Sequence, residues 1–442
     1  MAANPPVSDL AQLRQQALGA YRAGRLGDAL RFCREILAQL PDRPDVLGFA
    51  GMIALEMGSA DQAAELYTRA VRQRPDFVEA YYNLGNALMK LGRSEAAADA
   101  YRQAAELKPD LVAAHNNLGN ALHALGRDAE AADTYRRVLR LVPDSPEVQR
   151  NLGIALERVG ERTAAIEAYR AAIACRPDWP LAYSNLANAL LSAGEALPAI
   201  EACDRWLTVS PGNIEALSIK ALALCEAGER EAAAYLLDFK LVRQIKIEPP
   251  PSYSSLKEFN RALVYYTLAH PTLHVPEEAD PHYHHPALAI TKTFFGPSEG
   301  PVAAFEAIVR RSVADYIAAI PPDATHPFLA HPPKQWEFAS WAAVLHFQGN
   351  LTPHIHLDGY LSGVYYPQLP DLVGAPGQGK AGFFELGPPP EQFPLKRQPH
   401  ALTIRPEEGL MILFPSYFYH HTIPFESNQR RISIAFDACP RA

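Results

Sequence analysis

A proline returns every 34 residues through the first half of this chain, and no other feature limits the possible folds as strongly. Each of these prolines closes a segment with apolar residues at helical spacing and is followed by Asp or Gly. Proline lacks a backbone N–H and clashes with the preceding turn, so it ends a helix. A fixed period of this length predicts one helical unit stacked along an axis. The prolines are Pro41, Pro75, Pro109, Pro143, Pro177 and Pro211.

Two further columns of the repeat indicate how each helix pair packs. Small residues at the eighth repeat position let the two helices approach closely, and a large residue at the twenty-fourth fills the gap to the next pair. The small column is Ala17, Gly51, Gly85, Gly119, Gly153, Ala187 and Ala221, and the second is Cys33, Tyr67, Tyr101, Tyr135, Tyr169 and Cys203. The stretch NLGNALMKLGRSEAAADAYRQAAELKP resembles the tetratricopeptide repeat. About seven copies cover residues 9–245, which predicts an all-α superhelix over residues 1–245.

An asparagine column marks the helix that usually lines the concave groove of such an array. Asn83, Asn117, Asn151 and Asn185 share the sixth repeat position, and Asn86, Asn120 and Asn188 follow a turn later. Solenoid grooves typically bind peptides or proteins. We expect the sixth-position amides to contact an extended peptide backbone. The alternative is that they only solvate the groove or belong to a common repeat consensus.

Charge and cysteine content exclude several other classes. The 442 residues include 41 basic and 49 acidic ones, for a net charge of −8, which lacks the basic footprint of a nucleic-acid binder. No run approaches the roughly 18 apolar residues of a membrane helix. The five cysteines are scattered without a C-x-x-C pair, so we expect no disulfide framework and a reducing, cytoplasmic location.

The second half of the chain changes character after residue 245. Residues 255–270 and 301–320 have helical spacing of apolar residues, and from Trp336 onward short strands alternate with Gly- and Pro-rich connectors. We therefore expect a linker and helical lead-in over residues 246–335 and a β-barrel or sandwich over residues 336–442. Trp336 and Trp341 are expected to pack the β-core, with a role facing the substrate as the alternative. The histidines of DPHYHHPAL (His282, His284 and His285) are expected to lie in a solvated loop, with metal binding as the alternative.

The stretch TPHIHLDGYLSGVYY, residues 352–366, holds the candidate metal ligands. His354, His356 and Asp358 fall at every second position, so in a strand all three face one way. A His-x-Asp pair followed far downstream by a histidine is the pattern of the 2-His-1-carboxylate site that holds Fe(II) with open positions. The downstream part is GLMILFPSYFYHHTIPFESNQRRISIAFD, which offers His420 or His421.

The last strand of the chain carries a candidate anion receptor. In RISIAFD, Arg431 and Ser433 point to one side of the strand, while the isoleucines point to the other. A buried guanidinium beside a hydroxyl suits a carboxylate, because its planar fork donates two parallel hydrogen bonds. A dicarboxylate could chelate a metal at one end and be held by Arg431 at the other.

These residues carry a family resemblance over residues 336–442. The motifs HxHxDGxLSGVYY, LFPSxFYH and RISIAFD resemble the 2-oxoglutarate- and Fe(II)-dependent oxygenases. They are closest to a bacterial and phage subgroup often found behind tetratricopeptide repeats and related to prolyl hydroxylases. The resemblance implies a double-stranded β-helix (jelly-roll) core. It also implies that Fe(II), 2-oxoglutarate and O2 are used to hydroxylate a C–H bond, with release of succinate and CO2.

The resemblance also implies residue roles. His356 and Asp358 would be the proximal metal ligands and His420 the distal one, preferred over His421 because Pro424 follows four residues later. His354 is a further candidate ligand or neighbouring group, because members of the subgroup often show His-x-His. The far carboxylate of 2-oxoglutarate would be bound by Arg431, with Ser433 and Tyr366 beside it and Arg430 as the alternative.

Three functions are compatible with this sequence. The first is a dioxygenase that hydroxylates a residue of a protein or peptide presented by the repeats. The second applies the same chemistry to a small molecule or natural-product precursor, and the third is a non-catalytic repeat adaptor with an inactive barrel. None of the three involves nucleic acid or a membrane.

Overall fold

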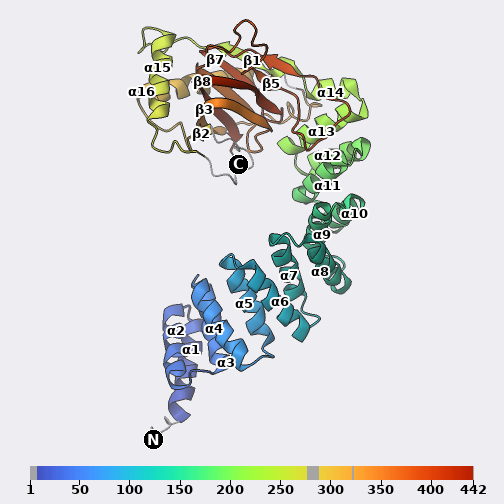
Figure 1. The fold of residues 1–442 in the computed structure, drawn as a ribbon, viewed down its shortest axis with the longest axis vertical. Helices are drawn as coiled ribbons and strands as arrows, with labels where there is room; N and C mark the ends of the chain where they lie inside the picture. Colours follow the sequence, from blue (N-terminus) through green and yellow to red (C-terminus); the bar gives the residue numbers. More distant parts are fainter. Residues whose placement is uncertain (1–6, 276–287, 321–322, 442) are drawn as a thin grey trace. The chain divides into compact units, whose positions relative to one another are not determined.

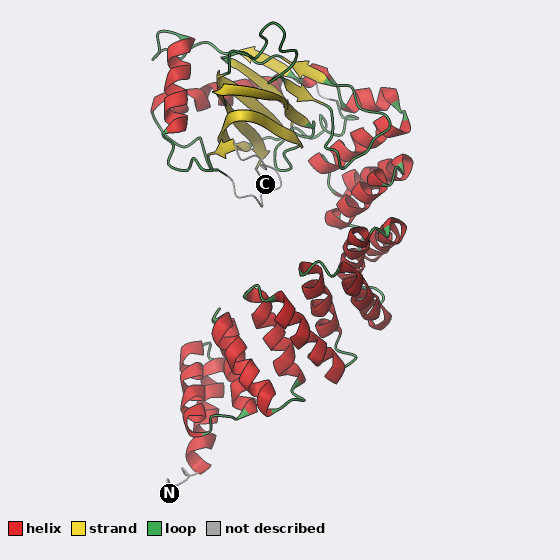
Figure 2. Ribbon diagram, in the orientation of Figure 1, coloured by secondary structure: helices red, strands yellow, loops and turns green. Residues whose placement is uncertain are grey.

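The computed structural model describes residues 7–275, 288–320 and 323–441. The chain divides into two compact units, Met1–Asp178 and Trp179–Ala442, and each is described by itself. The first unit is entirely helical in its described part, and the second combines helices with a β-sheet (Figures 1 and 2). The histidines of DPHYHHPAL lie outside the described residues.

The first unit stacks antiparallel helix pairs at the predicted period. The prolines of the 34-residue column lie in the short turns between pairs, where they end the second helix of each pair. The predicted helical repeat array is confirmed. Its helices are α1 (Val7–Arg22), α2 (Leu26–Gln39), α3 (Pro44–Glu56), α4 (Ala60–Gln73), α5 (Val78–Lys90), α6 (Ser94–Leu107), α7 (Val112–Ala124), α8 (Asp128–Leu141), α9 (Pro146–Val159) and α10 (Arg162–Cys175).

The two size columns of the repeat meet in space. Tyr135 on α8 is buried against Gly119 on α7, and a Cβ atom added to Gly119 would lie 2.5 Å from the tyrosine ring. The same contact recurs between Gly85 and Tyr101. Because the ring occupies the volume of a Cβ, glycine at the eighth position is a condition for tyrosine at the twenty-fourth.

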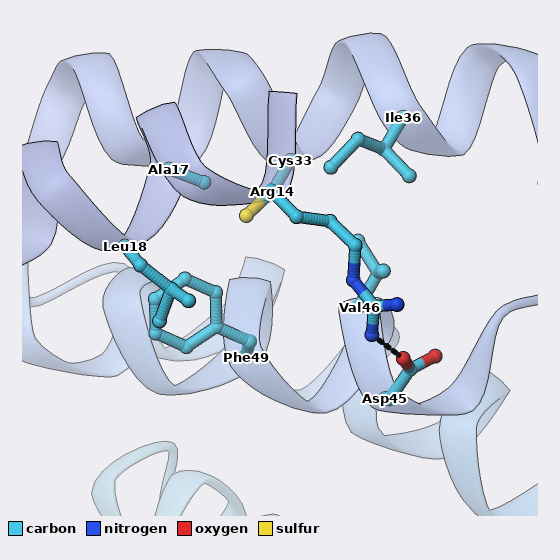
Figure 3. Close-up of a pocket in the computed structure, with 8 residues that line it drawn as sticks. All are labelled: Arg14, Ala17, Leu18, Cys33, Ile36, Asp45, Val46 and Phe49. Atoms are coloured by element: carbon cyan, nitrogen blue, oxygen red, sulfur yellow. Dashed lines mark hydrogen bonds and ion pairs between the residues drawn. The ribbon is translucent and has the colours of Figure 1, made fainter. Parts of the chain in front are cut away.

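The first repeat departs from this rule in both columns together. It has Ala17 and Cys33 where the next four repeats have glycine and tyrosine. A cavity of about 180 Å³ lies there, with Ile36 and Phe49 among its lining residues (Figure 3). The alanine methyl and the short thiol side chain leave unfilled the space that a tyrosine ring takes in the following repeats.

The second unit begins with the last repeats and continues into an antiparallel sheet. Its helices are α11 (Pro180–Ser192), α12 (Ala196–Val209), α13 (Ile214–Ala227), α14 (Arg230–Leu236), the 3-10 helix η1 (Phe239–Leu241), α15 (Leu256–Leu268) and α16 (Gly300–Ala319). Its strands are β1 (Arg243–Lys246), β2 (Leu288–Ile290), β3 (Trp336–His354), β4 (Leu361–Gln368), β5 (Phe384–Leu386), β6 (Leu402–Ile404), β7 (Leu410–Pro415) and β8 (His420–Pro440).

The strand order is β1-β7-β4-β8-β3-β2, with β5 pairing both β6 and β8, and all pairs are antiparallel. β1 spans the predicted limit at residue 245 and pairs with β7, so the sheet includes residues from before that limit. Strand pairing does not show where a folding unit begins, so the predicted domain limits stay a prediction.

The long strands β3 and β8 curl upon themselves. Trp341 near the start of β3 lies beside His356, just past its end, with ring centroids 5.2 Å apart. The register between β3 and β8 shifts at three places between Leu345 and His354, and such irregularities bend a strand pair. This curvature is consistent with the predicted jelly roll.

One face of the sheet packs on α15 and α16, which lie over the two segments predicted to be helical. The ring of Phe305 on α16 packs against that of Tyr365 on β4, with centroids 4.7 Å apart. A Cβ at Gly363 would overlap the ring of Phe436, so glycine is required where β4 pairs with β8 at this position. The candidate site residues lie on the opposite face of the sheet, where Tyr366 contacts Arg431.

The last two repeat helices belong to the same hydrophobic core as the sheet. Leu217 on α13 and Leu236 on α14 are buried in one cluster with strand residues such as Leu413. The hydroxyl of Tyr417 donates to the carbonyl of Leu236 at 2.5 Å, and that of Tyr316 donates to the carbonyl of Leu241 at 2.7 Å. In this part of the chain, the repeat pattern and the sheet core overlap.

Disulfide bonds and membrane-spanning helices are the two features that the sequence did not lead us to expect. All five cysteines lie in the described part and are free of disulfides. Of the described helices, none is both long enough and apolar enough to cross a bilayer.

Candidate metal centre

Three histidines converge at the end of the curled strand pair. His354 closes β3, His356 lies two residues beyond it, and His420 opens β8, where it pairs with His354. One ring nitrogen of each lies within 4.8 Å of the others. The ring centroids are 4.4 Å apart for His354 and His420 and 4.8 Å for His356 and His420. Such spacing allows all three to bind one ion.

Hydrogen bonds at Nδ1 orient the three rings. His354 and His420 donate from Nδ1 to the carbonyls of Thr352, at 2.8 Å, and Phe418, at 3.1 Å. His356 donates from Nδ1 to a carboxylate oxygen of Asp437 at 2.6 Å. A carbonyl only accepts, so Nδ1 carries the proton and Nε2 keeps its lone pair in the neutral ring. This is the usual arrangement of a histidine that ligates a metal through Nε2.

Burial adds two indications that an ion fits here. His356 Nε2 is buried and has no hydrogen-bond partner among the described residues, which is costly unless something binds it. Burial, reinforced by His354 and His356, holds the pKa of His420 well below its usual range. A neutral imidazole is the form that binds a metal. The three side chains therefore suit a divalent cation.

Asp358 lies outside this group. β3 ends at His354, and Leu357 and Asp358 form an exposed turn, so the alternation expected for a longer strand stops before the aspartate. The acid that meets His356 is Asp437, 81 residues further on. The assignment of Asp358 as a ligand is not supported by proximity and stays a prediction.

Asp437 could have been found from the strand pattern. It is the last residue of RISIAFD and lies an even number of residues from Arg431 and Ser433. In a strand, the three side chains therefore point to one side of β8. The alternation that places Arg431 and Ser433 on one side of the strand thus applies equally to Asp437.

Arg431 is a buried cation with incomplete pairing. Its guanidinium is 1% exposed and donates from Nη1 to the carbonyl of Gly382. The ring of Tyr366 lies 5.1 Å from it, and Nε has no partner among the described residues. No acidic side chain of the described part forms an ion pair with it, and burial lowers its pKa. A buried charge without a counter-ion is costly, so this pocket suits an anion.

Tyr366 lies on β4, and Ser433 lies on β8, the strand that also carries Arg431. Burial raises the pKa of the Tyr366 hydroxyl to about 12, opposed by the charge of Arg431 and by hydrogen bonding to it. Ser433 is buried two residues along β8. Two hydroxyls and a guanidinium are thus available to one ligand.

Strand β4 connects the two ends of the site. Ser362 hydrogen-bonds Asp437 and His356, and Tyr366 lies under Arg431. Both side chains are on one face of the strand, four residues or about 13 Å apart. An elongated ligand with an anionic group at each end can therefore lie between the histidines and the arginine.

Aromatic side chains enclose the histidine end. Phe414 of β7 and Phe384 of β5 lie 4.7 and 5.7 Å from His420, between ring centroids. Trp341, expected in the core, is half-buried beside His356. This apolar surround limits the access of water to the cluster.

The two alternative residues lie apart from the site. His421 turns its Nε2 toward Glu385, at 3.6 Å, while His420 joins the cluster. Arg430 is exposed, and its backbone carbonyl accepts a hydrogen bond from Gln368.

The asparagines of the repeats bond mainly to their own array. Asn151 donates to Asn120, whose oxygen also accepts from the Tyr135 hydroxyl at 2.8 Å, and Asn117 and Asn86 repeat the pattern with Tyr101. Asn83 accepts from Asn86 at 3.4 Å, and Asn185 lies on α11. The bonds between asparagines of different helices join successive repeats, and the tyrosine bonds join the two helices of one repeat. Peptide contact by Asn83, Asn117, Asn151 and Asn185 stays a prediction.

Comparison with protein families supports both halves of the chain. Residues 339–437 match the family described as "Putative 2OG-Fe(II) oxygenase", and residues 50–112, 85–146 and 150–214 match the tetratricopeptide repeat. A 2OG-Fe(II) oxygenase-family domain follows tetratricopeptide repeats. The matched oxygenase segment contains the three histidines, Arg431 and Asp437.

The similar solved structures cover less than half of this chain. A crystal structure of MamA protein is 23% identical, covers 38% of this chain and 92% of its own, and has a TM-score of 0.37. A structure of YrrB, titled a TPR protein with an unusual peptide-binding site, is 18% identical, covers 42% and 97%, and has a TM-score of 0.39. No curated protein matches the chain.

Proposed function

We propose that this chain is an Fe(II)- and 2-oxoglutarate-dependent dioxygenase that hydroxylates a residue of a protein or peptide recruited by the repeats. The observation that carries the proposal is the pairing of a partly buried three-histidine cluster with a buried guanidinium that has no acidic partner among the described residues. A metal-binding end and an anion-binding end, joined by one face of β4, suit a chelating dicarboxylate.

In this proposal His354, His356 and His420 hold the iron through Nε2. The sequence favoured Asp358 as a ligand, but His354 is the group that lies beside the other two. Arg431 binds the far carboxylate of 2-oxoglutarate through its free donor, and Tyr366 and Ser433 donate their hydroxyls to the same group. When bound, iron, 2-oxoglutarate and O2 would supply the oxidation of a substrate C–H bond, with succinate and CO2 released.

The remaining residues prepare the site. Three protein ligands leave open positions on an octahedral ion, as this chemistry requires. Phe414, Phe384 and Trp341 keep water from the histidine end, which protects a reactive centre from side reactions. The repeats would raise the local concentration of the reacting side chain by binding the polypeptide that carries it.

Succinate formation from 2-oxoglutarate and Fe(II), without added substrate, tests the ligand set. We expect His354→Ala and His420→Ala to lower the rate below detection, because each removes one of three ligands. Asp358→Ala is the matched control and should keep at least half of the wild-type rate. A dead Asp358→Ala beside an active His354→Ala would restore the ligand set favoured by the sequence, and an inactive wild type would contradict the proposal.

Arg431→Ala tests the anion end in the same assay. Truncating one partner of a buried charged pair costs about 2–5 kcal/mol, so the KM for 2-oxoglutarate should rise at least about 30-fold. Arg430→Ala removes an exposed neighbouring charge and should leave the KM unchanged. Equal effects of the two variants would mean that the guanidinium acts only through overall charge.

A further inference from the structure

Asp437 is a carboxylate that contacts a histidine of the cluster. Its Oδ1 accepts from His356 Nδ1 at 2.6 Å, and the side chains are only 12% and 8% exposed. The bond is charge-assisted and withdrawn from water, and both properties strengthen it. Because Nδ1 is held in this way, the ring plane of His356 and its tautomer are fixed.

Two buried serines extend the network, and one of them contacts the carboxylate directly. Ser362 donates to the same Oδ1 at 2.7 Å, and the hydroxyls of Ser362 and Ser416 lie 2.8 Å apart. Both serines are 0% exposed. They come from the LSGVYY and LFPS segments, so the network joins β4, β8 and the end of β7 around one aspartate.

Gly359 makes room for this network. A Cβ added there would lie 2.7 Å from the Ser416 hydroxyl and 3.1 Å from the Asp437 Cβ. The segment just after the histidine ligands can therefore pass close to the aspartate only as glycine. The positions of the aspartate and of His356 are determined together.

We infer that Asp437 is a positioning residue that supplies, through His356, the negative charge that a cluster of three neutral histidines lacks. The inference rests on the proposed function. A carboxylate bound to the far nitrogen of a metal-ligating histidine fixes its orientation and raises its basicity, and loss of such a group typically costs 10–100-fold in metal affinity. Asp358, being exposed and outside the cluster, has no such contact.

Cobalt(II) titration of the metal-free, full-length protein tests this role, with the visible absorption of the bound ion as the signal. We expect Asp437→Asn, which keeps the shape and removes the charge, to weaken cobalt binding 10–100-fold and to change the absorption band. Asp358→Asn removes an exposed charge nearby and should bind cobalt within about threefold of wild type. Thermal unfolding of the metal-free variants shows whether the fold is retained.

The outcomes separate the inference from the proposed function. Wild-type protein that binds no cobalt would contradict the metal centre itself. Wild-type binding with an unchanged Asp437→Asn would overturn the role of Asp437 and leave the centre standing. If Asp437→Asn does not fold, Ser362→Ala takes its place: a loss of about tenfold supports the role, because the carboxylate is then released on one side, and unchanged binding overturns it.

Discussion

The repeats and the sheet domain build their contacts over very different separations along the chain. In the repeats, Tyr135 bonds to Asn120, 15 residues away, and the same bond recurs between Tyr101 and Asn86. In the sheet domain, His356 bonds to Asp437, 81 residues away. A solenoid is stabilised by contacts within each repeat and between neighbouring repeats, so the same contact recurs from one repeat to the next. A curled sheet brings each site residue from a different strand.

The last repeat helices belong to the repeat pattern and also to the core of the sheet domain. α13 and α14 follow the repeat period, yet Leu217 and Leu236 are buried with the strands. Tyr417 and Tyr316 add hydrogen bonds from the sheet domain to the backbone beyond α13. The comparison therefore predicts that the sheet domain depends on the final repeats for its own stability.

Removing the repeats tests this dependence and should have the largest effect. A fragment of residues 246–442 loses Ile214, Leu217, Leu224 and Leu236 from the core. At about 1.5–3 kcal/mol for each buried side chain, the loss is about 6–12 kcal/mol, comparable to the stability of a whole domain. We expect this fragment to lack a cooperative thermal transition by circular dichroism.

The matched control is the fragment of residues 179–442, which retains α11 to α14 and should unfold cooperatively. If residues 246–442 melted as sharply as the longer fragment, the predicted limit at residue 245 would be a true folding boundary. The repeats would then contribute nothing to the stability of the sheet.

A double-mutant cycle within the repeats should give a smaller and strictly local effect. Gly119→Ala places a methyl group against Tyr135, and overpacking of this kind costs about 1–3 kcal/mol. In the Tyr135→Cys background the ring is gone, as in the first repeat, where Ala17 accompanies Cys33. There the alanine should stabilise the helix by up to about 1 kcal/mol.

Urea denaturation of the four proteins gives the coupling free energy between positions 119 and 135, expected at about 1–3 kcal/mol. The same cost for Gly119→Ala in both backgrounds would mean that the tyrosine ring does not determine the glycine. Succinate formation serves as the control, because a change confined to one repeat should leave the oxygenase site intact.

The candidate site could be predicted in part. His420 was preferred over His421 from Pro424, and the structure brings His420 to the cluster. Arg431 and Tyr366 were placed from the strand pattern and the resemblance, and they lie together. Asp358 does not lie beside His356 and His420, because side chains alternate in this way only as long as the strand continues. β3 ends at His354, and a turn carries Asp358 out to solvent.

By itself, the sequence determined the helical repeat, its pairing of glycine with tyrosine, and the residue types available for a metal and an anion. These follow from periodicity and strand parity, which express contacts between near neighbours in the chain. Only the tertiary structure decided which imidazoles meet, that Asp437 stands behind His356, and that α13 and α14 complete the core of the sheet. The physical reason is that these contacts depend on how far β3 and β8 curl, and that curvature is set by the packing of the whole domain.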